Sequence, residues 1–163
     1  MSHQVTITRT TTTTTTSAIL INTGYMRSWS GLLKLCQTIL GAVCLGIVAY
    51  YADQVGVVYT RNAQFFFILM TTTFLTATFC LLLACVLSLS AGTVISKTLY
   101  ELIYHSIAFI LYLAASLRLI IQISDHKRSY SYDGHMAASV IGLVNTALYL
   151  LSAVFSYRSY RLP

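Results

Sequence analysis

Two ionisable side chains in one apolar stretch of the chain could carry out chemistry, and a third follows them. Glu101 and His105 are four residues apart, so in a helix they lie on one face, and Arg118 comes later in the same stretch. A carboxylate beside an imidazole can belong to a proton or ion pathway, but it can also form a polar contact between helices. The elements that carry these residues decide between the two.

The chain contains four apolar stretches, each long enough to cross a bilayer. A helix rises about 1.5 Å per residue and the hydrocarbon core is about 30 Å thick, so about 20 apolar residues suffice. Hydrophobic residues make up 56% of the 163 residues and charged residues only 9%, which indicates an all-α membrane protein, a bundle of four transmembrane helices. The predicted spans are residues 32–51, 64–87, 99–123 and 136–157.

These spans divide the chain into a transmembrane domain and two tails. Residues 1–27 are expected to be a disordered tail, because the threonine-rich run 8–17 cannot form a hydrophobic core. The transmembrane domain is expected over residues 28–157, followed by a short tail at 158–163. A polar stretch precedes the first span, so we expect that span to be a retained anchor rather than a signal peptide.

The distribution of basic residues predicts that both tails are cytoplasmic, because lysine and arginine near span ends tend to stay on that side. In this orientation Arg61, Lys127 and Arg128 lie outside, and the inner side holds Arg9, Arg27, Lys34, Lys97, Arg158 and Arg161. The net charge of +6 then favours anionic inner-leaflet lipid as a partner, not nucleic acid. Arg27 and Lys34 would each contribute about 1 kcal/mol if they reached the lipid surface.

The four cysteines fall inside predicted spans, so no extracellular disulfide framework is expected. Cys36 and Cys85 lie near the cytoplasmic face, where palmitoylation is possible, although small apolar packing residues are the simpler interpretation. The second outer loop, about residues 124–135, contains aspartates and histidines, which are metal-ligand types. It offers no fixed scaffold, so we predict no metal site and no cofactor.

The depth of the polar side chains determines what they can do in the membrane. Glu101 falls in the first turn of its span and can reach head groups, and Arg118 can extend to the outer interface. Only His105 is expected to be buried throughout, in contact with Glu101, with threonines of the second span or with Asn145 of the fourth. A proton relay would stop after one turn, so these residues are expected to join helices rather than to transport ions.

Small residues four apart allow helix backbones to approach each other closely. Such pairs occur at Ala42 and Gly46 in the first span and at Ala138 and Gly142 in the fourth. They predict helix-packing faces. The spacing does not distinguish packing within one chain from a homo-oligomer or from contact with another transmembrane protein.

The residues that lead into the first span, GYMRSWSGLLKLCQTILG from Gly24 to Gly41, resemble the start of a MARVEL domain. The short first outer loop without cysteine and the stretch ELIYHSIAFILYLAAS from Glu101 to Ser116 fit the same family. The likeness extends to the chemokine-like-factor (CKLF-like) MARVEL transmembrane family. It implies four helices with cytoplasmic termini, in plasma or vesicle membranes.

The resemblance also implies a function in vesicle trafficking, in the organisation of cholesterol-rich membrane, or in the surface stability of partner membrane proteins. No set of nucleophile, base and oxyanion donor is evident, so we expect no enzyme. The leading hypothesis is a membrane adaptor that binds lipids and other transmembrane proteins laterally. The alternative is a small channel or proton-coupled transporter that uses Glu101 and His105.

Overall fold

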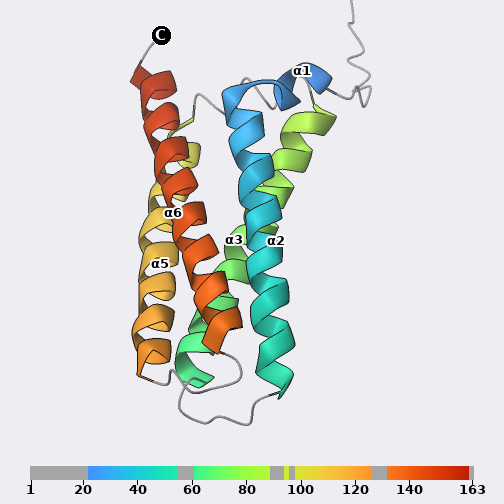
Figure 1. Cartoon of the computed structure of the whole chain (residues 1–163). Coiled ribbons are helices and arrows are strands. Elements are labelled where there is room, and N and C mark those ends of the chain that lie inside the picture. Colours follow the sequence, from blue (N-terminus) through green and yellow to red (C-terminus); the bar gives the residue numbers. More distant parts are fainter. Residues whose placement is uncertain (1–21, 55–60, 89–93, 96–97, 126–131, 162–163) are drawn as a thin grey trace, which may run out of the picture.

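A computed structural model describes most of the chain, and in the described part the long elements are all helices (Figure 1). The described residues are 22–54, 61–88, 94–95, 98–125 and 132–161. A short helix, α1 (Thr23–Met26), comes first. Four long helices follow it, α2 (Trp29–Gln54), α3 (Arg61–Leu87), α5 (Leu99–Ser124) and α6 (Tyr132–Arg161).

Each long helix is long and apolar enough to cross a membrane, which confirms the predicted all-α, four-span fold. The largest difference from the predicted bounds is at α6, which starts four residues earlier and ends at Arg161. An acidic residue in its first turn, Asp133, and two basic residues in its last turn, Arg158 and Arg161, suit the helix dipole. The helix therefore continues past the apolar segment that hydropathy detects.

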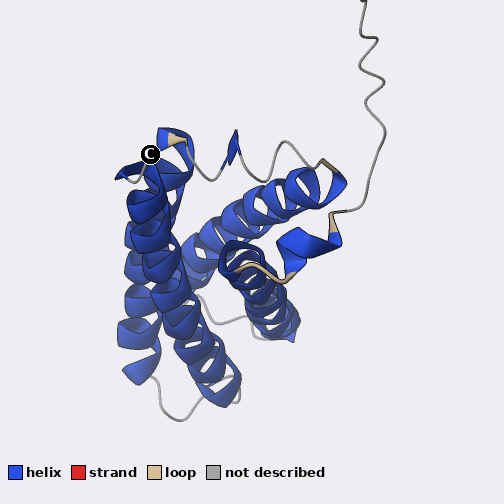
Figure 2. Ribbon diagram, turned by 90° about the horizontal axis from the view of Figure 1, so that it is seen from above, coloured by secondary structure: helices blue, strands red, loops and turns tan. Residues whose placement is uncertain are grey.

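The four long helices form one bundle in which α2 and α5 occupy opposite corners. Each of these two helices packs mainly on α3 and α6. Helices α5 and α6 run side by side, whereas α3 is tilted and ends beyond α2, next to α1 (Figures 1 and 2). Helix α1 and the C-terminal end of α6 lie at the same end of the bundle, as an even number of crossings requires (Figure 1).

Helix α1 is fastened to the end of α3. The Asn22 backbone N–H donates to the Val86 carbonyl at 2.7 Å, and the Asn22 side chain caps α1 by accepting from the Tyr25 N–H at 3.0 Å. Tyr25 is buried against Leu82 and Cys85. This helix lies within the segment 1–27 that the composition predicts to be disordered, whereas the threonine-rich run 8–17 lies outside the described residues.

Aromatic side chains fill the centre of the bundle. The rings of Phe74, Tyr112 and Tyr149, one each from α3, α5 and α6, lie with centroids 5.8 to 6.4 Å apart. Because lipid tails are as apolar as these rings, close packing rather than the hydrophobic effect holds the helices together.

Candidate functional site

A buried ion pair at the α1 end of the bundle joins two helices that otherwise touch little. Lys34 of α2 donates to the carboxylate of Glu101 of α5, and their side chains are only 1% and 2% exposed. The Lys34 ammonium also donates to Ser30 Oγ at 2.8 Å. The ion pair therefore connects opposite corners of the bundle.

Helical periodicity brings these residues of α2 to the interior. Ser30, Lys34 and Gln37 are spaced four and three apart, so they share one face. That face continues into the apolar core at Cys44 and Val48, which are fully buried. Lipid would leave a charged side chain unpaired on the outer face, so the polar residues turn inward.

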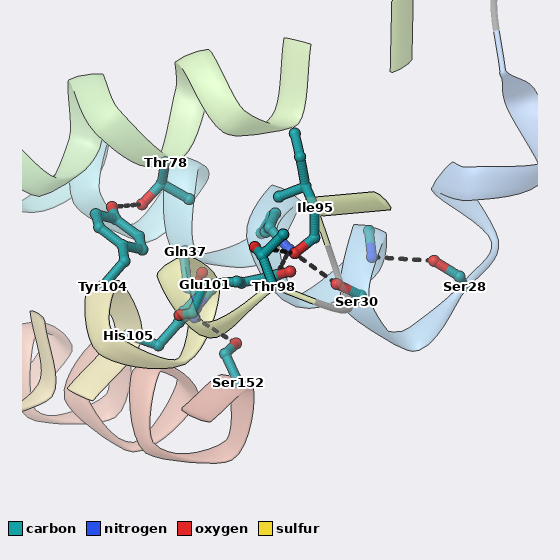
Figure 3. Close-up of polar contacts among 12 residues, drawn as sticks. Ser28, Ser30, Gln37, Thr78, Ile95, Thr98, Glu101, Tyr104, His105 and Ser152 are labelled. Carbon is teal, nitrogen blue, oxygen red and sulfur yellow. Dashed lines mark hydrogen bonds and ion pairs between the residues drawn. The ribbon is translucent and has the colours of Figure 1, made fainter. Parts of the chain in front are cut away.

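His105 lies one turn beyond Glu101 on the same buried face of α5. Its Nδ1 is 2.8 Å from the Glu101 carbonyl oxygen, and its ring lies against the rings of Tyr104 and Tyr149. A carbonyl only accepts, so Nδ1 carries the ring hydrogen. Figure 3 shows His105 beside Glu101, Gln37 and Ser152.

Two sequence-based expectations for this cluster were wrong. Glu101 does not reach the head groups, since it is buried in the ion pair. Lys34 cannot attract anionic lipid, because its side chain is buried too, whereas Arg27 is exposed. For His105, the expected contact with Glu101 is the one seen, through the Glu101 carbonyl of its own helix, and not a contact with threonines of α3 or with Asn145.

A second set of polar contacts continues from this cluster toward the bundle centre. Gln37 Nε2 donates to Ser152 Oγ at 2.9 Å, and Asn145 Nδ2 contacts the Gln37 carbonyl at 3.5 Å. The Thr78 hydroxyl lies 2.7 Å from the Tyr104 hydroxyl and 2.8 Å from that of Tyr149 (Figure 3 draws the Tyr104 contact). Polar contacts therefore extend further than the single turn that the sequence predicted.

Sequence reasoning missed Lys34, Gln37 and Ser152 as parts of the site. The position of Lys34 near the start of a span predicts a charge at the membrane surface. The available signal was the spacing of Lys34 and Gln37, which places two polar side chains on one face of an apolar helix. Serine gives no comparable signal, because it is common in transmembrane helices.

Arg118, the third predicted intramembrane polar residue, does not join this cluster. Its side chain is exposed, and its guanidinium carbon lies 5.8 Å from the centroid of the Phe66 ring on α3. A cation over an aromatic face is a favourable arrangement at an exposed site. Arg118 thus lies on the outer surface toward the far end of the bundle.

The structure separates the two predicted small-residue pairs. Ala138 and Gly142 are buried, and a Cβ atom added at Gly142 would lie 2.6 Å from Ser116 Oγ. Ala42 and Gly46 are exposed on α2, and no described atom lies within 4 Å of a Cβ placed at Gly46. One pair therefore packs the bundle internally, and the other lies on its outer surface.

The two cysteines with predicted palmitoylation also differ in exposure. Cys85 is fully buried and packs with Tyr25 and Leu82 under α1, whereas Cys36 is partly exposed on α2. An acyl transferase needs an accessible thiol, so Cys36 is the better placed of the two. Palmitoylation itself stays a prediction.

At the far end of the bundle, His135 belongs to α6 and not to the outer loop where the sequence placed it. It is buried, and its Nε2 lies 2.8 Å from Gln64 Nε2 of α3. Within the described residues, no three histidine, cysteine, aspartate or glutamate side chains group as a metal site would need. Residues 126–131 of the predicted loop lie outside that part.

Comparison with protein families gives one match, to the MARVEL model, described as a membrane-associating domain, over residues 25–155. The chain belongs to the MARVEL family. The match runs from Tyr25 of α1 to Phe155 of α6, so this MARVEL domain includes α2, α3 and α5, most of α6, and Tyr25, which packs against the end of α3. No curated protein and no solved structure matches the chain.

Membership confirms the resemblance to a MARVEL domain and identifies a multi-pass membrane protein. A membrane-associating domain is consistent with a membrane organiser. The buried cluster of Lys34, Glu101 and His105 is a feature of the interior of this domain, whereas Ala42, Gly46 and Arg118 lie on its surface. The interior cluster bears on bundle stability or ion transport, and the outer surface bears on contacts with lipids and other membrane proteins.

Proposed function

We propose that this MARVEL protein is a non-enzymatic membrane organiser with CKLF-like properties, which binds lipids and other transmembrane proteins through the outer surface of its bundle. It would act in vesicle trafficking, in membrane-domain organisation or in the surface stabilisation of partner membrane proteins. Its place would be the plasma membrane or vesicle membranes, with both termini cytoplasmic.

The observation that carries the proposal is the uncovered small-residue pair on α2. The described part of the chain leaves open space beside Gly46, and Ala42 lies one turn away on the same exposed face. Helices in lipid associate mainly by close packing at small residues, since no hydrophobic force drives them together. A partner helix could approach α2 here more closely than at its larger exposed side chains, such as Ile39 and Tyr50.

The inward orientation of the charged cluster supports the same proposal. Lys34 and Glu101 satisfy each other inside the bundle, so they place no unpaired charge on the lipid-facing surface of α2 and α5. An apolar outer surface with a small-residue face is suited to lateral contacts within the membrane. It gives a protein with short loops a surface for recognition.

The test is partner co-purification in mild detergent after proximity labelling in the native cell. Gly46→Leu should reduce recovery of partners while the protein stays inserted and folded. Ala137→Leu, at an exposed small residue of α6, is the matched control and should leave recovery unchanged. If Gly46→Leu keeps every partner and deletion of residues 8–17 abolishes recruitment, the tail and not the bundle is the functional element.

The alternative is a small channel or proton-coupled transporter that uses Glu101 and His105. One observation favours it, namely that further polar side chains lie deeper in the bundle, where Gln37 contacts Ser152 and Asn145. Purified protein in liposomes separates the two functions. An organiser leaves proton and ion permeability at the level of empty liposomes, whereas a transporter gives a flux that His105→Ala abolishes.

A further inference from the structure

A small cleft opens into the buried cluster between α2, α5 and α6. Its volume is about 30 Å³, and four serines contribute to its walls together with Glu101, namely Ser30, Ser152, Ser156 and Ser159. A space of this size can hold a water molecule if polar partners surround it. The cleft has such partners, since hydroxyls and a carboxylate line it.

Several buried polar atoms, one of them in the cleft and the others deeper in the bundle, have no hydrogen-bond partner in the described part of the chain. Glu101 lines the cleft, and its Oε2 is unpartnered although its Oε1 binds Lys34. The same is true of Gln37 Oε1, whose amide nitrogen is bonded to the cleft residue Ser152, and of His105 Nε2. Asn145 Oδ1 is also unpartnered, and its amide nitrogen contacts the Gln37 carbonyl.

All four of these atoms are acceptors. The carboxylate and the two amide oxygens only accept hydrogen bonds, and both amide nitrogens already act as donors. His105 holds its hydrogen on Nδ1, where it faces the Glu101 carbonyl, so the neutral ring has a lone pair on Nε2. These four acceptors therefore lack donors, and a ligand that binds beside them must supply the hydrogens.

The charges already present in the cluster determine which kind of ligand can supply these donors. Lys34 already neutralises Glu101, so a further cation would meet an ammonium group beside the carboxylate. Lipid tails have no donors, and the cleft is too narrow for a helix. Water is small, neutral and carries two donors, and buried water commonly satisfies polar groups that the chain leaves unpaired.

We propose that the space between α2, α5 and α6 holds ordered water, which enters through the serine-lined cleft and donates hydrogen bonds to Glu101 Oε2 and His105 Nε2. Such water would link α2 and α5, which the ion pair joins, to α6, whose serines line the cleft. It would also connect His105 to the solvent at the α1 end. The proposal concerns bound water and holds whether or not the protein organises membranes.

The test uses the full chain in liposomes with ¹⁵N-labelled histidine and measures magnetisation transfer from water by solid-state NMR. The His105 signal is the one lost in His105→Gln. We expect transfer from water to Nε2 of a neutral ring that carries its hydrogen on Nδ1. A His105 signal that receives no magnetisation from water overturns the proposal, as does a ring protonated on Nε2 without water contact.

Variants of the cleft residues test the route by which water enters. Ser156→Leu adds bulk to a buried wall of the cleft, and Ser159→Leu adds it at the exposed rim, where folding is less at risk. Either variant, if folded, should slow the transfer to His105 several-fold. Ser106→Leu on α5, which does not line the cleft, should leave the rate unchanged. An unchanged rate in folded Ser159→Leu and Ser156→Leu protein would show that water does not enter there.

Discussion

Replacing Glu101 with glutamine removes the negative partner of the buried ion pair and leaves the Lys34 ammonium uncompensated between α2 and α5. Both side chains are at most 2% exposed, so bulk water does not screen the remaining charge. Breaking a buried pair by removing one partner costs about 3–5 kcal/mol. Since each 1.4 kcal/mol is a factor of ten, the unfolding equilibrium should shift by a factor of about 100 or more.

The double variant Lys34→Met with Glu101→Leu should recover most of the lost stability. Replacing both members of a buried pair by apolar residues of similar volume is often neutral or stabilising, because two desolvated charges disappear together. Arg118→Met is the control for loss of a charge, since Arg118 is exposed and its ring contact contributes about 1 kcal/mol or less.

Unfolding in mixed micelles, followed by circular dichroism during titration with a denaturing detergent, measures these differences. The original chain, Lys34→Met alone, Glu101→Leu alone and the double variant form a cycle that gives the coupling between Lys34 and Glu101 directly. Two results would refute the reasoning. One is a Glu101→Gln protein as stable as the original chain, and the other is a double variant whose loss equals the sum of the single losses.

Two further predictions concern packing and orientation. Gly142→Leu should destabilise the bundle by about 1–3 kcal/mol, because the added side chain meets Ser116 Oγ and the Phe67 ring, whereas Gly46→Leu should unfold like the original chain. Thermal unfolding in detergent compares them, and equal stability of both variants would contradict the packing of α6. Epitope tags at either terminus should be accessible to antibody only after permeabilisation, and a tag near Ser129 should be accessible on intact cells. Staining of a terminal tag on intact cells would reverse the proposed orientation.

The sequence predicted the number and type of the long elements because these depend on local properties. The length and apolar character of each stretch are sufficient to identify a membrane-spanning helix, and the motif around residues 24–41 was sufficient to suggest the family that the comparison confirms. The ends of the helices were less predictable. Polar residues such as Tyr132 and Asp133 continue α6 beyond its apolar segment, and hydropathy does not detect them.

The sequence did not show which side of each helix faces the interior. In a soluble helix a polar outer face reveals the buried one, but in lipid both faces are apolar and this contrast nearly disappears. Ala42 with Gly46 and Ala138 with Gly142 have the same spacing, yet the first pair is exposed and the second is buried. Likewise, Cys85 is buried because α1 folds over it.

The sequence by itself thus determined four apolar helices and a MARVEL domain, through local length and composition. Only the tertiary structure decided that Lys34 and Glu101, 67 residues apart, form an ion pair. Their partnership depends on how α3 and α6 hold α2 and α5 at opposite corners of the bundle. A charge near the end of a span can extend to the head groups or turn inward to a partner, and only the packing of the other helices determines which is possible.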